Sequence, residues 1–176
     1  MRSPHCSPPR ADHYEYAVMP SPLGLLGLVA TDRGLCEIMT GIDSEAAFRE
    51  YLEKTYQAMP VAKDQKTREA CIQLQEYFEG RRRRFDCPLD LNQGSFFQQR
   101  VWQALRTIPY GETRSYAWVA QRIRKPGAAL AVGSANGRNP IPILVPCHRV
   151  IRHNGDIGGY TGGVEKKRFL LHLEKR

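Results

Sequence analysis

Short apolar runs separated by turn residues dominate the first half of the chain. Runs over residues 14–19, 25–31 and 35–40 predict three strands, and the polar triplet 32–34 predicts the turn between the last two. After these runs the apolar spacing changes to three and four residues, which is typical of amphipathic helices. The pattern therefore predicts a small sheet followed by helices.

Two helices are expected after the strands. The first is capped by Asp43 or Ser44 and continues to about Gln57; the second covers residues 67–79, with Gly80 at its C′ position. The residues expected on their inner faces are Ala47, Tyr51 and Leu52 in the first helix and Cys71, Leu74, Tyr77 and Phe78 in the second.

The pattern of the second half is mainly helical. Ser95 is expected to cap a helix to about Thr107 that buries Phe97, Val101, Trp102 and Leu105. Two short helices follow, one over residues 115–123 and one ending near residue 136, with a break at residues 125–127. Paired short helices around a Pro/Gly turn indicate a helix-turn-helix.

The composition of the 176 residues is that of a globular protein, with 41% hydrophobic and 25% charged residues. The longest apolar stretch, residues 23–30, is too short to span a membrane, and residues 1–10 lack the apolar core of a secretory signal. We expect residues 1–12 to be a disordered tail. Five cysteines without a repeating spacing favour a reducing compartment, so we expect a cytoplasmic protein, or a nuclear one in a eukaryote.

Charge divides the chain into two unlike halves. Residues 1–90 carry 12 Lys and Arg against 14 Asp and Glu, net −2, whereas residues 91–176 carry 14 against 4, net +10. Clustered positive charge of this kind is typical of a nucleic-acid partner. The run Arg81–Arg84 is a separate feature, for which a solvated loop is favoured over a localisation signal or a phosphate-binding patch.

The densest chemistry lies between residues 139 and 150. Prolines at 140, 142 and 146 restrict the backbone that leads to Cys147, and His148 and Arg149 follow at once. A thiolate next to a base and positive charge is the usual arrangement of a cysteine nucleophile, although a buried cysteine beside a core histidine is an equally open interpretation. The apolar run before Cys147 predicts a buried, strand-like segment.

Other kinds of site are not indicated. The sequence has no Cys-x-x-Cys pair, no His-Glu-x-x-His, no Gly-x-Ser-x-Gly and no phosphate-binding Gly-x-x-x-x-Gly-Lys motif. Glycines at 155, 158, 159, 162 and 163 suggest either a close backbone approach to a flat ligand or a series of turns.

The segment 146–150, Pro-Cys-His-Arg-Val, resembles the acceptor site of O6-alkylguanine-DNA alkyltransferases, the methylated-DNA–protein-cysteine methyltransferases. The same resemblance covers Asn139-Pro140, residues 158–163 (Gly-Gly-Tyr-Thr-Gly-Gly) and most of residues 95–174, whereas residues 1–90 match weakly. It implies suicidal repair of O6-alkylguanine, and possible O4-alkylthymine repair, in duplex DNA, with nucleotide flipping and no cofactor.

The resemblance also implies residue roles. Cys147 is the acceptor, His148 its base through a water, and Glu174 the partner that orients the histidine. Asn139 orders the turn, and Tyr116 protonates or hydrogen-bonds the departing guanine. The base and alkyl pocket is assigned to Pro142, Val150, Tyr160, Thr161 and Gly162, although ordinary packing remains open for Tyr116, Tyr160 and Pro142.

DNA contacts are assigned by the same resemblance to Ser115, Ala129, Leu130, Ser134, Arg138 and Arg149. Leu130 departs from the family pattern, which has an arginine that fills the space left by the extruded base. Leucine can act as an apolar wedge but cannot hydrogen-bond the orphaned cytosine. We therefore expect weaker duplex binding and slower duplex repair than in a Leu130→Arg variant.

Some members of this family hold a structural zinc, and Cys36 and Cys87 fall at two of the implied ligand positions. Thr31 occupies a third position and His13 is a loose candidate for the fourth, so a complete tetrahedral site is not expected. A Cys36–Cys87 disulfide in oxidised protein remains open.

Three other classes of protein are compatible with parts of the pattern: a noncatalytic binder of alkylated DNA, a helix-turn-helix regulator and a cysteine hydrolase. The presence of Cys147, the lack of a dimerisation element and the basic second half, respectively, argue against them. We expect an α/β (α+β) monomer without a membrane or obligate protein partner. Residues 13–91 should form a ribonuclease-H-like domain, and residues 92–176 a winged-helix-like domain that binds DNA and accepts the alkyl group.

Overall fold

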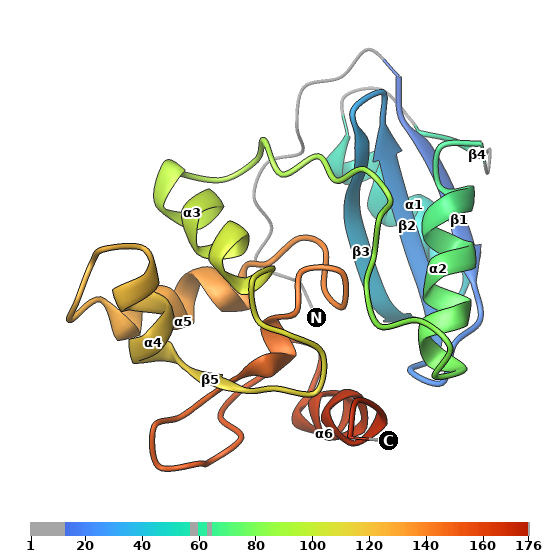
Figure 1. Cartoon of the computed structure of the whole chain (residues 1–176). Helices are drawn as coiled ribbons and strands as arrows, with labels where there is room; N and C mark the ends of the chain where they lie inside the picture. Colours follow the sequence, from blue (N-terminus) through green and yellow to red (C-terminus); the bar gives the residue numbers. More distant parts are fainter. Residues whose placement is uncertain (1–12, 57–59, 63–64, 176) are drawn as a thin grey trace. The chain divides into compact units, whose positions relative to one another are not determined.

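The computed structural model describes residues 13–56, 60–62 and 65–175, so the expected tail 1–12 lies outside the described residues. These residues form two compact units that divide between residues 93 and 94, close to the expected boundary at 91/92. The first unit mixes sheet and helix and the second is mainly helical, so the predicted α+β class is confirmed (Figure 1).

The N-terminal unit is built on a sheet of β3-β2-β1-β4, formed by Gly34–Ile42, Leu25–Thr31, Glu15–Met19 and Val61–Ala62. Neighbours among β1, β2 and β3 are antiparallel, and β4 runs parallel to β1. The three predicted strands are thus confirmed, with β3 extended to Ile42; β4 was not predicted, because a two-residue exposed strand has no alternation to detect.

Helix α1, Glu45–Thr55, begins at its N-cap Ser44, whose hydroxyl oxygen accepts from the Ala47 amide. Leu52 is buried as expected and Tyr51 is half-buried, but Ala47 is exposed and its neighbour Phe48 is buried instead. Phe48 lies directly over Gly27 of β2, where a Cβ would come within 2.5 Å of the ring. Because Gly27 has no side chain, the Phe48 ring can pack directly against the sheet.

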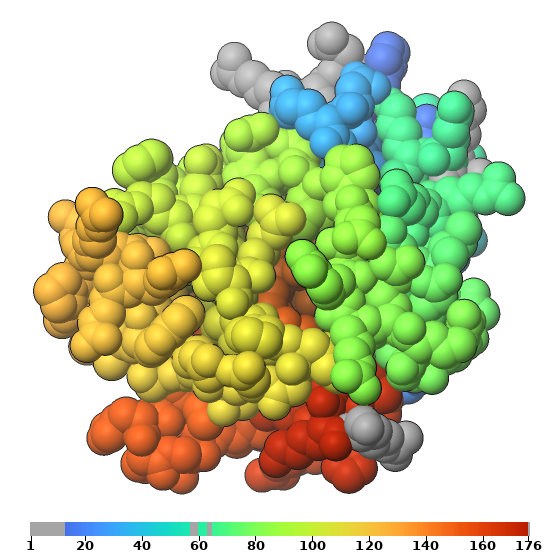
Figure 2. Space-filling view, viewed as in Figure 1, coloured from blue at the N-terminus to red at the C-terminus, as the bar shows by residue number. Residues whose placement is uncertain are grey.

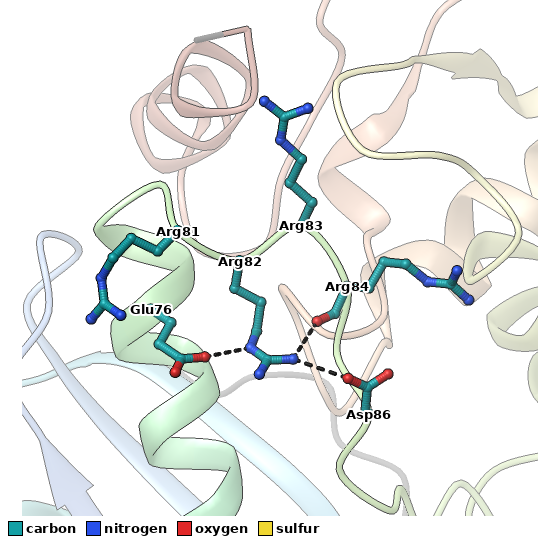
Figure 3. Close-up of a pocket in the computed structure, with 6 residues that line it drawn as sticks. All are labelled: Glu76, Arg81, Arg82, Arg83, Arg84 and Asp86. Carbon is teal, nitrogen blue, oxygen red and sulfur yellow. Dashed lines mark hydrogen bonds and ion pairs between the residues drawn. The ribbon is translucent and has the colours of Figure 1, made fainter.

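Helix α2, Arg68–Phe78, ends before Gly80, which has the positive φ of 74° expected for a C′ glycine. The chain then forms the arginine-rich loop, residues 81–84. Arg82 binds the Glu76 and Asp86 carboxylates at 2.6 and 3.0 Å, and donates to the Arg84 carbonyl oxygen at 2.9 Å (Figure 3). Arg81 pairs with Glu79. These contacts fit the favoured solvated loop, in which Arg82 fixes the turn after α2.

The C-terminal unit contains α3 (Phe96–Leu105), α4 (Tyr116–Arg122), α5 (Ala129–Gly137) and α6 (Val164–Leu173). Strand β5 (Arg114–Ser115) pairs in parallel with β6 (Val150–Ile151), which directly follows the 3₁₀ turn η1 (Cys147–Arg149). Ser95 caps α3 in a full capping box with Gln98, as its sequence position predicts. Val101, Trp102 and Leu105 are fully buried between the helices.

Candidate active site

The backbone that carries Cys147 is a closed turn rather than the strand-like segment expected from its apolar residues. The Asn139 side chain accepts from the Ile141 amide at 3.1 Å and donates to the Val145 carbonyl at 2.7 Å. The Cys147 amide donates to the same carbonyl at 2.8 Å. The expectation failed because the three prolines lack the amide hydrogens that a strand ladder needs.

Cys147 begins η1 and is almost fully buried, at 4% exposure. Burial raises the pKa of its thiol, while the neighbouring Asn139 and Tyr160 side chains and the Lys167 charge act in the opposite direction. The net shift keeps the thiol protonated in the resting protein. Alkylation at this sulfur therefore requires a group that removes its proton.

His148 and Glu174 supply that group. Burial lowers the pKa of the fully buried His148, so its ring is neutral, and Nε2 lies 2.8 Å from Glu174 Oε1. Burial acts to raise the pKa of Glu174, but its contacts with His148 and Arg149 outweigh this effect and hold the carboxylate ionised. An ionised carboxylate only accepts, so Nε2 carries the ring proton and Nδ1 is left as an acceptor. Nδ1 is buried and has no hydrogen-bond partner among the described residues.

Arg149 was expected to contact DNA, and the structure corrects this expectation. Its side chain is buried, binds Glu174 through two hydrogen bonds and donates to the Ile108 carbonyl at 2.7 Å. The positive charge of Arg149 therefore acts on Glu174 inside the C-terminal unit, where it keeps the carboxylate ionised and in place.

Two buried polar residues near Cys147 were missed by the sequence reasoning. Lys167 is fully buried, and its Nζ donates to the carbonyl oxygens of Val150 at 2.6 Å and Gly159 at 3.4 Å; burial lowers its pKa to about 8. Asn136 donates from Nδ2 to the Cys147 carbonyl. For Lys167 a signal existed, because it lies three residues from both Val164 and Leu170 on the apolar face of α6.

The expected pocket residues come from several segments, and two of them, Tyr160 and Tyr116, lie close enough to Cys147 to interact with its charge. Tyr160 is half-buried with its hydroxyl oxygen inside, where burial and the nearby Cys147 raise its pKa. Tyr116 begins α4, and a Cβ on Gly158 would lie 3.4 Å from its hydroxyl. Thr161 is exposed and donates to the Gly137 carbonyl, while Pro142 and Gly162 are half-buried. Burial also raises the pKa of Tyr116.

Helices α4 and α5 form the expected helix-turn-helix, and the gold atoms of α4 and the turn after it lie on the face that Figure 2 shows. Leu130 is 93% exposed on its first turn, a large apolar side chain with no packing role. Ser134 and Arg138 are also exposed and Ala129 is half-buried. The Ser115 hydroxyl instead accepts from the Trp118 amide as the N-cap of α4.

Two of the possible zinc ligands make hydrogen bonds to other groups in the structure. Cys36 donates its thiol hydrogen to the Val29 carbonyl, and Thr31 donates to Asp90 at 2.8 Å. Within residues 13–56, 60–62 and 65–175, no group of three or more His, Cys, Asp or Glu could hold a metal ion. Cys36 and Cys87 are not disulfide-bonded in this structure.

Comparisons with known proteins cover both units. Residues 14–91 match the ribonuclease-like domain of 6-O-methylguanine DNA methyltransferase, and residues 96–176 match the DNA-binding domain of the same family. A methylated-DNA–protein-cysteine methyltransferase of Mycolicibacterium paratuberculosis is 47% identical, covering 92% of this chain and 93% of that protein.

Solved structures show the same relationship. Mycobacterium tuberculosis OGT, crystallised with DNA, is 45% identical with a TM-score of 0.78, over 93% of this chain and 92% of that one. An O6-methylguanine DNA methyltransferase from Methanococcus jannaschii is 26% identical with a TM-score of 0.65, over 90% and 93% of the two chains. The chain therefore belongs to the 6-O-methylguanine DNA methyltransferase family.

Proposed function

We propose that this protein repairs DNA by transferring an alkyl group from the O6 atom of guanine to the Cys147 sulfur, once per molecule. The observation that carries the proposal is the buried chain of Cys147, His148 and Glu174, in which a neutral imidazole is held by an ionised carboxylate. Family membership supplies the substrate class, because the relatives are methylated-DNA–protein-cysteine methyltransferases.

The proton of the Cys147 thiol passes through a water to His148 Nδ1, the acceptor left by the Nε2–Glu174 hydrogen bond. The sulfur then attacks the alkyl carbon, forming an S–C bond as the C–O6 bond breaks. The electron pair of that bond stays with guanine, which takes a proton from Tyr116. The proton held by His148 then returns through water to the Tyr116 phenolate. The step balances without a cofactor, and it leaves a thioether that His148 cannot cleave.

The target atom lies within the base stack of a duplex, so we propose that the nucleotide is flipped into the site. The exposed position of Leu130 on α5 supports a role as the apolar wedge that fills the vacated space. Exposed Ser134 and Arg138 on the same helix–turn segment support contacts to the DNA backbone.

We further propose that the protein acts as a cytoplasmic monomer with DNA as its partner. A unit of net charge +10 over residues 91–176 supports this partner. Among the described helices, none has the length and apolarity needed to cross a bilayer.

The test is a titration of the protein with duplex DNA that contains one O6-methylguanine, followed by intact mass. We expect one added methyl group per protein and an equal loss of O6-methylguanine, with no transfer to Cys147→Ser. A Cys71→Ser variant, which changes a half-buried cysteine in the other unit, should react like the parent protein. Repeated turnover would identify a hydrolase instead.

A further inference from the structure

The last turn of α5 carries a buried asparagine that the mechanism above does not use. Asn136 is 6% exposed, and its Nδ2 donates to the Cys147 carbonyl oxygen at 3.3 Å. Its Oδ1 atom is also buried and has no hydrogen-bond partner within the part of the chain that the structure describes. The side chain therefore makes one specific contact, and that contact is to the backbone of the alkyl acceptor.

The turn that carries Asn136 is fixed from a second side. The indole Nε1 of fully buried Trp102 donates to the Ala135 carbonyl at 2.9 Å. This bond ties the end of α5 to α3, so the Asn136 backbone has little freedom to follow a movement of Cys147. The asparagine is a fixed anchor rather than a side chain that adapts to its neighbour.

The other side of Cys147 is anchored from the same helix end. Its amide donates to the Val145 carbonyl, which also accepts from Asn139 Nδ2 at 2.7 Å. Asn139 therefore holds the peptide before the acceptor through the Val145 carbonyl, and Asn136 binds the carbonyl of the peptide after it directly. Two asparagines three residues apart together determine the direction in which the Cys147 side chain leaves the backbone.

We infer that Asn136 is a positioning residue for alkyl transfer, holding the Cys147 carbonyl so that the sulfur points at the alkyl carbon. This inference rests on the function proposed above. Displacement at a tetrahedral carbon requires the attacking atom, the carbon and the leaving oxygen to be in line, and small misalignments slow such reactions strongly. The Cys147 carbonyl also accepts from the Val150 amide within η1. Without the Asn136 donor it keeps that one bond, and the peptide has more freedom to rotate and lose this alignment.

Packing alone does not explain an asparagine at this position. A buried amide oxygen without a partner lowers stability, and an apolar side chain of similar shape would avoid that loss. The amide is explained by its donor, which an apolar residue lacks. Stability and reactivity should therefore respond in different directions when the amide is removed.

The experiment compares Asn136→Leu and Asn136→Asp with the parent protein, and uses Asn92→Leu, an exposed asparagine in the other unit, as the matched control. Leu keeps a similar side-chain size and removes the donor, and Asp keeps the side-chain shape and removes the donor while its carboxyl group is ionised. The rate of Cys147 alkylation is measured by intact mass over a concentration series of free O6-benzylguanine. Iodoacetamide alkylation of Cys147 and the melting temperature are measured in parallel.

We expect the maximal rate with O6-benzylguanine to fall about 10- to 100-fold in both variants, with its half-saturating concentration unchanged. Iodoacetamide is a small electrophile that no base pocket has to hold in one orientation, so it should react within about twofold of the parent rate. The melting temperature of Asn136→Leu should stay equal or rise.

Three results would overturn the inference. Unchanged O6-benzylguanine rates would show that the carbonyl contact does not position the sulfur. Equal losses with both reagents would indicate a change in the thiol itself, and a lower melting temperature or loss of folding in both variants would indicate a structural role. A parent protein that takes no alkyl group from either guanine substrate would instead contradict the proposed function.

Discussion

The guanidinium of Arg149 binds the Glu174 carboxylate in a bidentate pair, with Nε 2.8 Å from Oε2 and Nη2 2.9 Å from Oε1. Both side chains are buried, and the same carboxylate also holds the imidazole of His148. A fork of two hydrogen bonds fixes the plane of the carboxylate as well as its position. The arginine that follows the histidine in the sequence therefore orients the histidine through α6.

Replacing Arg149 should damage both stability and reactivity. An Arg149→Met variant leaves Glu174 as a buried charge with one polar partner fewer, and we expect a loss of about 3 kcal/mol in the free energy of unfolding. Alkyl transfer in the folded fraction should fall about tenfold, because the imidazole is less firmly oriented. Urea unfolding and single-turnover transfer measure the two effects. Arg138→Met, an exposed change, should leave the unfolding free energy unchanged.

The Glu174 carboxylate should make stability fall in acid. Its pKa in the folded protein is lower than the ordinary value of 4.5, so its contribution is complete above that pH and is lost as the pH falls through the folded value. Glu174→Gln should therefore be less stable than the parent at neutral pH, and its urea midpoint should fall less steeply between about pH 5 and pH 3. Parallel pH curves for both proteins would contradict this assignment.

Lys167 should support the thiolate of Cys147. Its Nζ is held by the Val150 and Gly159 carbonyls, and its charge acts to lower the pKa of the thiol. Lys167→Met should raise that pKa and slow iodoacetamide alkylation at neutral pH about tenfold, with a matching shift of the pH profile to higher pH. Lys54→Met, an exposed change in the other unit, is the control. A slower reaction with an unshifted profile would leave Lys167 a packing role only.

Leu130 should limit reaction in duplex DNA and leave the chemistry unaffected. An arginine at this 93% exposed position adds a hydrogen-bond donor and a positive charge at the place where we propose that the base is extruded. Leu130→Arg should therefore transfer from duplex O6-methylguanine about tenfold faster, with an unchanged rate on free O6-benzylguanine. The adjacent exposed Ala131→Arg adds the same charge at a different position. Equal acceleration in both variants would show that the added positive charge attracts DNA in general, and that position 130 has no special role.

Local signals predicted most of the fold. Strand β2 and the N-caps Ser44 and Ser95 appear where the sequence places them, because turn and capping chemistry acts over a few residues. The buried face of α1 was misjudged because the space for Phe48 is created by Gly27 on a strand, which periodicity within the helix does not reveal.

In the site, too, features set by neighbouring residues could be predicted and features set by distant residues could not. Adjacency makes Cys147 and His148 candidates, but the role of Arg149 depends on Glu174, which lies 25 residues away at the C-cap of α6. Resemblance suggested a DNA contact for Arg149, whereas burial turns its charge inward. Asn136 was missed because its partner is a backbone carbonyl, which leaves no mark in the sequence, whereas for Lys167 the signal was its position on the apolar face of α6.

The most direct test of the account is the position of the transferred group. After reaction with duplex DNA carrying one O6-methylguanine, the protein is digested and the modified peptide is sequenced by mass spectrometry. The account predicts a single methyl group on the sulfur of Cys147. A methyl group on another cysteine, or DNA that loses its methyl group while Cys147 stays unmodified, would contradict it.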